Sequence, residues 1–122
     1  MPELSRDERE FLASGVLQWA GPASPSQALA VALGAPSVEA LAEKGSKLGR
    51  KLRGSDALPF DEILFALIST EIIFASDRWG AGVEWHTVTG YSDSEAIEML
   101  RKLQRKLVGL GPWSPGQLSE QA

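Results

Sequence analysis

Two titratable side chains near the middle of this 122-residue chain, Glu71 and His86, are of types that perform acid–base chemistry. Glu71 lies in the most apolar segment, where a carboxylate has to be paired, hydrogen-bonded or neutral. A carboxyl group with a raised pKa is a candidate general base, and His86, the only histidine, is a candidate proton carrier. We favour the structural interpretation, in which Glu71, Thr87 and Thr89 anchor a loop, and we expect no catalytic residue.

Three carboxylates of the same region, Glu71, Asp77 and Glu84, have the oxygen ligands that hard cations prefer, but their spacing matches no known cation-binding loop. A zinc site usually needs several Cys or His ligands, and this chain has one His and no Cys. The glycines of Gly80–Gly82 are not followed by the Lys-Ser/Thr pair of a phosphate-binding loop. We therefore expect no metal and no cofactor.

The segment Ser76–Ser92 concentrates side chains that are typical of recognition sites, because it holds two of the four Trp and the only Tyr. Trp and Tyr dominate interface hot spots, since they bury a large area and keep one polar group. Long connections in compact domains tend to be functional, and this one is too aromatic to be disordered. The alternative is that these rings close the core from outside. The expected partner-binding residues are Arg78, Trp79, Glu84, Trp85, His86 and Tyr91.

Apolar periodicity and capping signals predict five helices around this segment. The pairs Ser5/Glu8 and Ser92/Glu95 have the spacing of capping boxes, which begin the first and the last helix. The chain is predicted to be an all-α, single-domain bundle of about five helices, with a long ordered aromatic loop between the fourth and fifth. The helical domain covers residues 1–109, and residues 110–122 form a partly disordered tail. The expected helices span about 6–19 and 25–33 (after Ser24 as N-cap), 38–52, 59–76 and 93–108.

Two local features depart from this helical pattern. Val83–Val88 is strand-like because it is rich in β-branched and aromatic residues, and it would be extended or pair across a dimer. Gly45 and Gly49 weaken the third helix. They therefore mark either a kink or the close approach of another helix.

The charges are segregated, although the net charge is only −4. Nine of the twelve basic residues lie in 44–53 and 101–106, which predicts either a surface that steers an acidic partner or two solvated helix faces. Residues 26–41 resemble a helix-turn-helix, with an apolar first helix, Gly at the turn and a capped second helix. A recognition helix should begin with side chains that reach base edges, whereas this one begins with Ser37-Val38-Glu39. Under this alternative, the nucleic-acid contacts would be Lys44, Lys47, Arg50, Lys51 and Arg53.

Composition narrows the function classes. The absence of Cys and of a long apolar run predicts a cytoplasmic protein without membrane contact. In size, acidity and lack of Cys the chain is similar to toxin-neutralising immunity proteins and to small inhibitors, a comparison by composition alone. The sequence predicts a non-enzymatic protein-interaction module that binds another protein through Arg78–Tyr91. The alternative is a DNA-binding regulator using residues 25–53. A homodimer is also expected, because the fourth helix is apolar on nearly every side.

Overall fold

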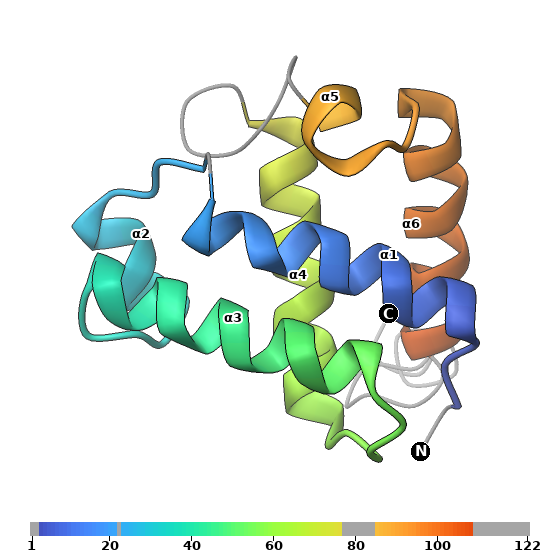
Figure 1. Cartoon of the computed structure of the whole chain (residues 1–122), viewed down its shortest axis with the longest axis horizontal. Helices are drawn as coiled ribbons and strands as arrows, with labels where there is room; N and C mark the ends of the chain where they lie inside the picture. Colours follow the sequence, from blue (N-terminus) through green and yellow to red (C-terminus); the bar gives the residue numbers. More distant parts are fainter. Residues whose placement is uncertain (1–2, 22, 77–84, 109–122) are drawn as a thin grey trace, which may run out of the picture.

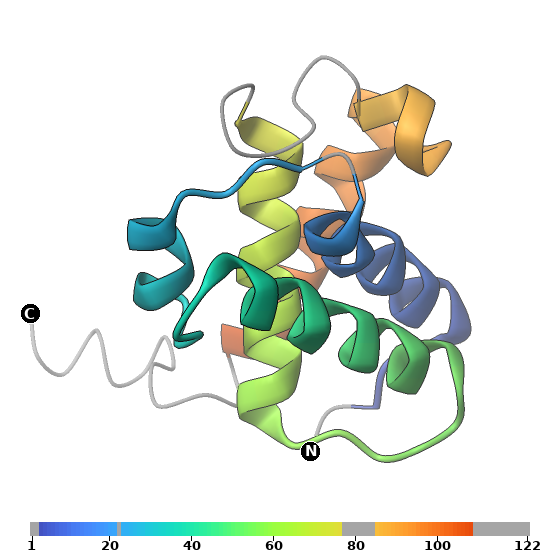
Figure 2. The same ribbon diagram turned by 60° about the vertical axis from the view of Figure 1, so that its left-hand side comes forward.

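In the part of the chain that the structure describes, the fold consists of helices and contains no strand, as the sequence predicts. The computed structural model describes residues 3–21, 23–76 and 85–108. Its elements are α1 (Arg6–Val16), the 3-10 turn η1 (Leu17–Ala20), α2 (Gln27–Ala32), α3 (Val38–Arg53), α4 (Phe60–Ala75), α5 (Trp85–Thr89) and α6 (Asp93–Val108). Figure 1 shows α1 and α3 crossing in front of α4, with α6 alongside it. Figure 2 shows α4 between α3 in front and α6 behind, so α4 is the central helix.

The starts of α1 and α6 confirm the predicted capping boxes. The Ser5 hydroxyl accepts a hydrogen bond from the N–H of Glu8 at 3.1 Å, and the Glu8 carboxylate accepts one from the N–H of Ser5 at 2.7 Å. Ser92 and Glu95 form the same reciprocal pair, at 3.2 and 2.9 Å. Each pair satisfies two backbone donors that the first helical turn leaves without intrahelical partners.

Two local predictions are wrong. The N-cap of α2 is Ser26 and not Ser24, because the Ser26 hydroxyl accepts from the N–H of Leu29 at 3.1 Å. Residues 85–88 of the strand-like piece form most of the helix α5, since burial of Trp85 overrides a weak strand propensity. The expected long loop is therefore interrupted by α5, a helix that the sequence did not predict. Residues 83–84 and the predicted tail 110–122 lie outside the described residues.

Three glycines allow close contacts that a larger side chain would block. A Cβ atom on Gly45 would lie 2.6 Å from the carbonyl oxygen of Val16, and one on Gly49 would overlap the side chain of Leu17. A Cβ on Gly15 would overlap the side chain of Thr70. Of the two interpretations of Gly45 and Gly49, close approach is the one the structure confirms, because α3 runs unbroken past both.

The hydrophobic core lies where α1 crosses α4. Phe11, Leu12 and Val16 of α1 form a buried stripe and are 0% exposed, and Trp19 of η1, which follows them, is 3% exposed. Leu41 and Leu52 of α3, Ile73 of α4 and Leu103 of α6 close this core from the other helices and are also 0% exposed. Helix α4 is buried on most sides but not all, because Leu64 and Ile68 are 36% and 37% exposed.

Candidate interaction site

Trp85 belongs to the core, which corrects its prediction as a partner-binding residue. Its side chain is 0% exposed. The ring stands edge-on to Phe74, with centroids 5.3 Å apart, and to Phe11 at 6.0 Å, both within the favourable range for aromatic pairs. A side chain without exposed surface offers nothing to a partner, so Trp85 fixes the start of α5 to the body of the protein.

Tyr91 and Thr89 fix the other end of α5. The Tyr91 ring is half-buried and stands edge-on to Phe11, with centroids 5.1 Å apart. Burial raises the pKa of the Tyr91 hydroxyl, and the nearby carboxylate of Glu10 adds to the effect. The Thr89 hydroxyl donates to the carbonyl of Trp85 at 2.7 Å and accepts from the N–H of Tyr91 at 3.2 Å. These contacts hold the connection between α5 and α6 in one conformation.

His86 and Thr87 are exposed on α5, where they are available to a partner. Arg78, Trp79 and Glu84 lie outside the described residues. The segment that carries these three residues starts where α4 ends, one residue after Ala75, and finishes at the buried Trp85. The chain that follows this segment is therefore fixed to the core at Trp85.

Glu71 joins α4 to α6. Its carboxylate accepts a hydrogen bond from the side-chain amide of Gln104 at 2.5 Å, and the carbonyl of that amide accepts from Arg101 at 2.9 Å. Among the described residues, Glu71 bonds Gln104 and neither Thr87 nor Thr89. The described contact of Glu71 is therefore with α6, and its predicted role as a loop anchor stays a prediction.

Apolar side chains remain in solvent beside this polar bridge. A shallow cavity of about 230 Å³ separates α4 from α6 and is lined on one side by Ala75 and on the other by Ile97, which is 47% exposed. Leu64 and Ile68 continue the exposed line along α4, with Ile72 half-buried beside them. We call Leu64, Ile68, Ile72, Ala75 and Ile97 the α4–α6 face.

The basic side chains of α3, the candidate DNA contacts, largely have partners within the protein. Lys51 pairs with Glu62 at 3.0 Å, and Arg53 pairs with Glu10 at 3.0 Å. These acids reduce the positive charge that α3 offers to a phosphate backbone, and DNA binding stays a prediction. The other three are Lys47, paired with Glu43 at 3.2 Å, Lys44, 4.1 Å above the ring of Phe65, and the exposed Arg50.

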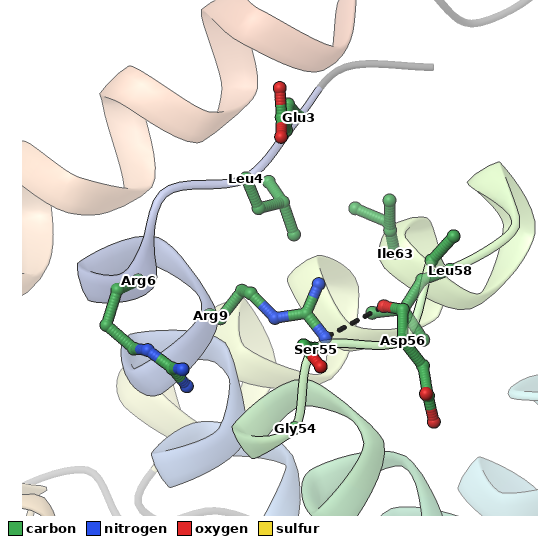
Figure 3. A pocket seen from close by; sticks show the side chains of 10 residues that line it. Glu3, Leu4, Arg6, Arg9, Gly54, Ser55, Asp56, Leu58 and Ile63 are labelled. Atoms are coloured by element: carbon green, nitrogen blue, oxygen red, sulfur yellow. Dashed lines mark hydrogen bonds between the residues drawn. The ribbon is translucent and has the colours of Figure 1, made fainter.

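A second cavity, of about 470 Å³, lies between the start of α1 and the α3–α4 connection. Figure 3 shows the Arg9 guanidinium beside this connection and the side chain of Asp56 pointing away from it. Arg9 donates to the carbonyls of Leu52 and Lys51 at 2.8 Å each, and to that of Asp56 at 3.0 Å. Arg9 therefore caps carbonyls at the end of α3, a structural role that could not be predicted from the sequence.

Glu8 is a fully buried carboxylate, 0% exposed, that the sequence analysis identified only as a capping residue. It accepts a hydrogen bond from Lys106 of α6 at 2.5 Å, and Lys102 lies 3.9 Å away. Burial alone would raise the pKa of Glu8, but the bonds from Lys106 and Ser5 and the two lysine charges outweigh it and lower the pKa. The burial of Glu8 was predictable from the sequence, because Glu8 precedes the apolar Leu12 by four residues and therefore lies on the same side of the helix.

Comparison with known proteins found no matching family model, no matching curated protein and no matching solved structure. Within residues 3–21, 23–76 and 85–108, no three or more His, Cys, Asp or Glu side chains are grouped so that they would hold a metal ion. No helix of these residues combines the length and the hydrophobicity needed to cross a membrane. The geometry of the described residues therefore carries the functional argument.

Proposed function

We propose that this chain is a non-enzymatic interaction module that binds another cytoplasmic protein through the segment Arg78–Tyr91. The observation that supports this is the attachment of the second part of the segment to the protein. Helix α4 ends at Ala75, shortly before the segment, and the buried ring of Trp85 and the half-buried ring of Tyr91 attach the second part of the segment to the protein. An immunity-type or inhibitor role is the form of this proposal that the composition favours.

This attachment matters because ordering a loop on binding costs free energy. A loop held by a rigid scaffold loses less conformational freedom when it meets a partner, so more of the contact energy appears as affinity. Trp79 and Arg78 are of the types enriched in hot spots. With Trp85 assigned to the core, Trp79 is the aromatic residue on which the proposal depends most.

The α4–α6 face gives the proposal an apolar surface at the end of α4, which precedes the segment in the sequence. Ala75 precedes Arg78, the first residue of the segment, by three residues. Ile97 lines the same cavity as Ala75. Exposed apolar side chains that stand together mark interaction sites, whereas scattered ones do not. Self-association, the second proposal of the same class, would use this face.

The test is co-purification of the tagged full chain from its organism of origin, compared between the wild type and Trp79→Ala. We expect a specific protein to be captured by the wild type and lost with Trp79→Ala, while the thermal unfolding midpoint stays unchanged. Val31→Ala is the matched control, because Val31 is 58% exposed on α2 and does not belong to Arg78–Tyr91. Unaltered capture by Trp79→Ala, or its unfolding, would contradict the proposal.

A further inference from the structure

We propose that the α4–α6 face binds a second copy of this chain, with the two α4 helices antiparallel and Ile68 at the two-fold axis. This inference rests on the proposed function only in that both make the chain an interaction protein. It uses different residues, so the two can fail separately.

The first step is the shape of the exposed surface on α4. Asp61, Leu64, Ile68, Ile72 and Ala75 follow one another at intervals of three or four residues, which places them on one stripe of a helix. None of the five is fully buried, whereas every buried residue of α4 lies outside this stripe. The stripe is apolar after its first member, from Leu64 to Ala75, over about three helical turns.

The second step is that the neighbouring helices leave this stripe open. On one side of it, Phe65 and Glu62 of α4 contact Lys44 and Lys51 of α3. On the other side, Glu71 is bonded to α6. Figure 2 shows the two flanking helices, with α3 in front of α4 and α6 behind it. A partner therefore meets a straight apolar ridge with a helix on either flank.

The third step is the charge pattern, which selects a second copy in the antiparallel direction. Asp61 precedes Ile68 by seven residues, and Ala75 follows it by seven. With Ile68 on the axis, Asp61 therefore lies beside the partner's Ala75. Arg101 lines the same cavity as Ala75, so each Asp61 meets the partner's Arg101, and symmetry makes this pair twice. A parallel arrangement would instead bring like charges together at Asp61, which is unfavourable.

The fourth step is the apolar match that this register produces. Leu64 lies four residues before the axis and Ile72 four residues after it, so Leu64 packs against the partner's Ile72 on both sides of the paired Ile68 side chains. Ile97, which is 47% exposed, extends the contact toward the start of the partner's α4. The interface is thus apolar at its centre and charged at its rim, as stable interfaces are.

Cysteine crosslinking tests the register directly, because the natural chain contains no Cys. In the full chain, Ile68→Cys places the two new thiols at the two-fold axis, within the Cα separation of roughly 4.4–6.8 Å that a disulfide requires. We expect oxidation with diamide to convert most of this variant into a covalent dimer. Val31→Cys, on the exposed part of α2, is the matched control and should stay monomeric. Equal crosslinking of both variants, or of neither, overturns the proposal.

Charge reversal, read by sedimentation equilibrium of the full chain, tests the direction. Asp61→Arg and Arg101→Asp alone should each weaken dimerisation by about tenfold, and the double variant should recover most of the wild-type affinity. No recovery in the double variant overturns the antiparallel register. Circular dichroism confirms that each variant is folded.

The same measurements would also show whether something other than a second copy covers the α4–α6 face. If the wild type is monomeric and Trp113→Ser dimerises, the chain covers the face with its own residues after α6, and the proposal is wrong. If the chain stays monomeric but Ile68→Ser abolishes capture of the protein that depends on Trp79, the face belongs to that partner instead. Loss of dimerisation with intact Trp79-dependent capture leaves the proposed function standing.

Discussion

Helix α3 packs closely against the end of α1 and the start of η1, whereas α4 leaves a row of apolar side chains in solvent beside α6. At the first contact, Gly45 and Gly49 leave no room for a side chain, and Arg9 and Arg53 tie the end of α3 to α1. At the second, Ile97 and Ile68 keep 47% and 37% of their surface exposed. We call these the α1–α3 contact and the α4–α6 face.

The difference separates stability from recognition within one small protein. Close packing at the α1–α3 contact gains dispersion energy and excludes water, which fixes one native arrangement. The α4–α6 face lacks part of this dispersion energy, because its apolar side chains remain exposed. A partner can bury this apolar surface. Helix α6 is joined to the rest partly through polar bonds, from Lys106 to Glu8 and from Gln104 to Glu71. Mutations on the two sides should therefore act on different quantities.

The largest effect is expected at Trp85, which the sequence predicts to bind a partner and the structure places in the core. Trp85→Ala removes a fully buried ring and should lower the free energy of unfolding by about 3–5 kcal/mol, measured by urea denaturation. Trp85→Phe is the matched control, because the Trp85 indole N–H has no hydrogen-bond partner among the described residues, and its loss should be much smaller. A change in the free energy of unfolding below about 0.5 kcal/mol for Trp85→Ala would show that Trp85 does not belong to the core.

Trp85 and Glu8 also show where sequence reasoning ends. The helices and capping boxes were predictable, because their signals lie within four residues and act through local hydrogen bonds. Whether Trp85 is core or contact depends on Phe11 and Phe74, which are distant in sequence. The burial of Glu8 was readable from its place four residues before Leu12, but its partner Lys106 lies 98 residues away. Periodicity can predict which residue is buried but does not identify the residue it contacts.

The second largest effect is expected for Glu8→Gln, which removes the charge that α6 binds. The loss of charged hydrogen bonds should cost about 2–3 kcal/mol in the free energy of unfolding near neutral pH. The folded state lowers the pKa of Glu8 below its ordinary value near 4.5. The contribution is therefore present above about pH 4.5 and is lost as the pH falls through the folded-state pKa. Denaturation curves of both proteins between neutral and acid pH should converge on the acid side, and a constant difference would show that the charge is unimportant.

A smaller loss is expected for Gly45→Ala at the α1–α3 contact. The added methyl group would lie 2.6 Å from the carbonyl oxygen of Val16, so α3 has to shift, at a cost of about 1–3 kcal/mol. Gly54→Ala is the control, since its nearest neighbour would be at an ordinary 3.5 Å. If the two variants unfold at the same urea concentration, the close approach contributes nothing and the contrast with the α4–α6 face fails.

The smallest effect is expected for the triple variant Lys47→Ala, Arg50→Ala, Lys51→Ala on the outer side of α3. Exposed ion pairs contribute about 0–1 kcal/mol, so the unfolding free energy should hardly change.

The net charge of −4 and the acids paired with Lys47 and Lys51 disfavour contact with a phosphate backbone. We therefore expect no gel retardation of a DNA duplex by the wild type, even at about 50 mM salt, where nonspecific binding is strong. Retardation that this triple variant abolishes, and that Arg105→Ala on α6 preserves, would make α3 a nucleic-acid surface. Recognition would then lie on the stable side of the molecule as well, because the same helix would carry both the close glycine packing and the binding charges.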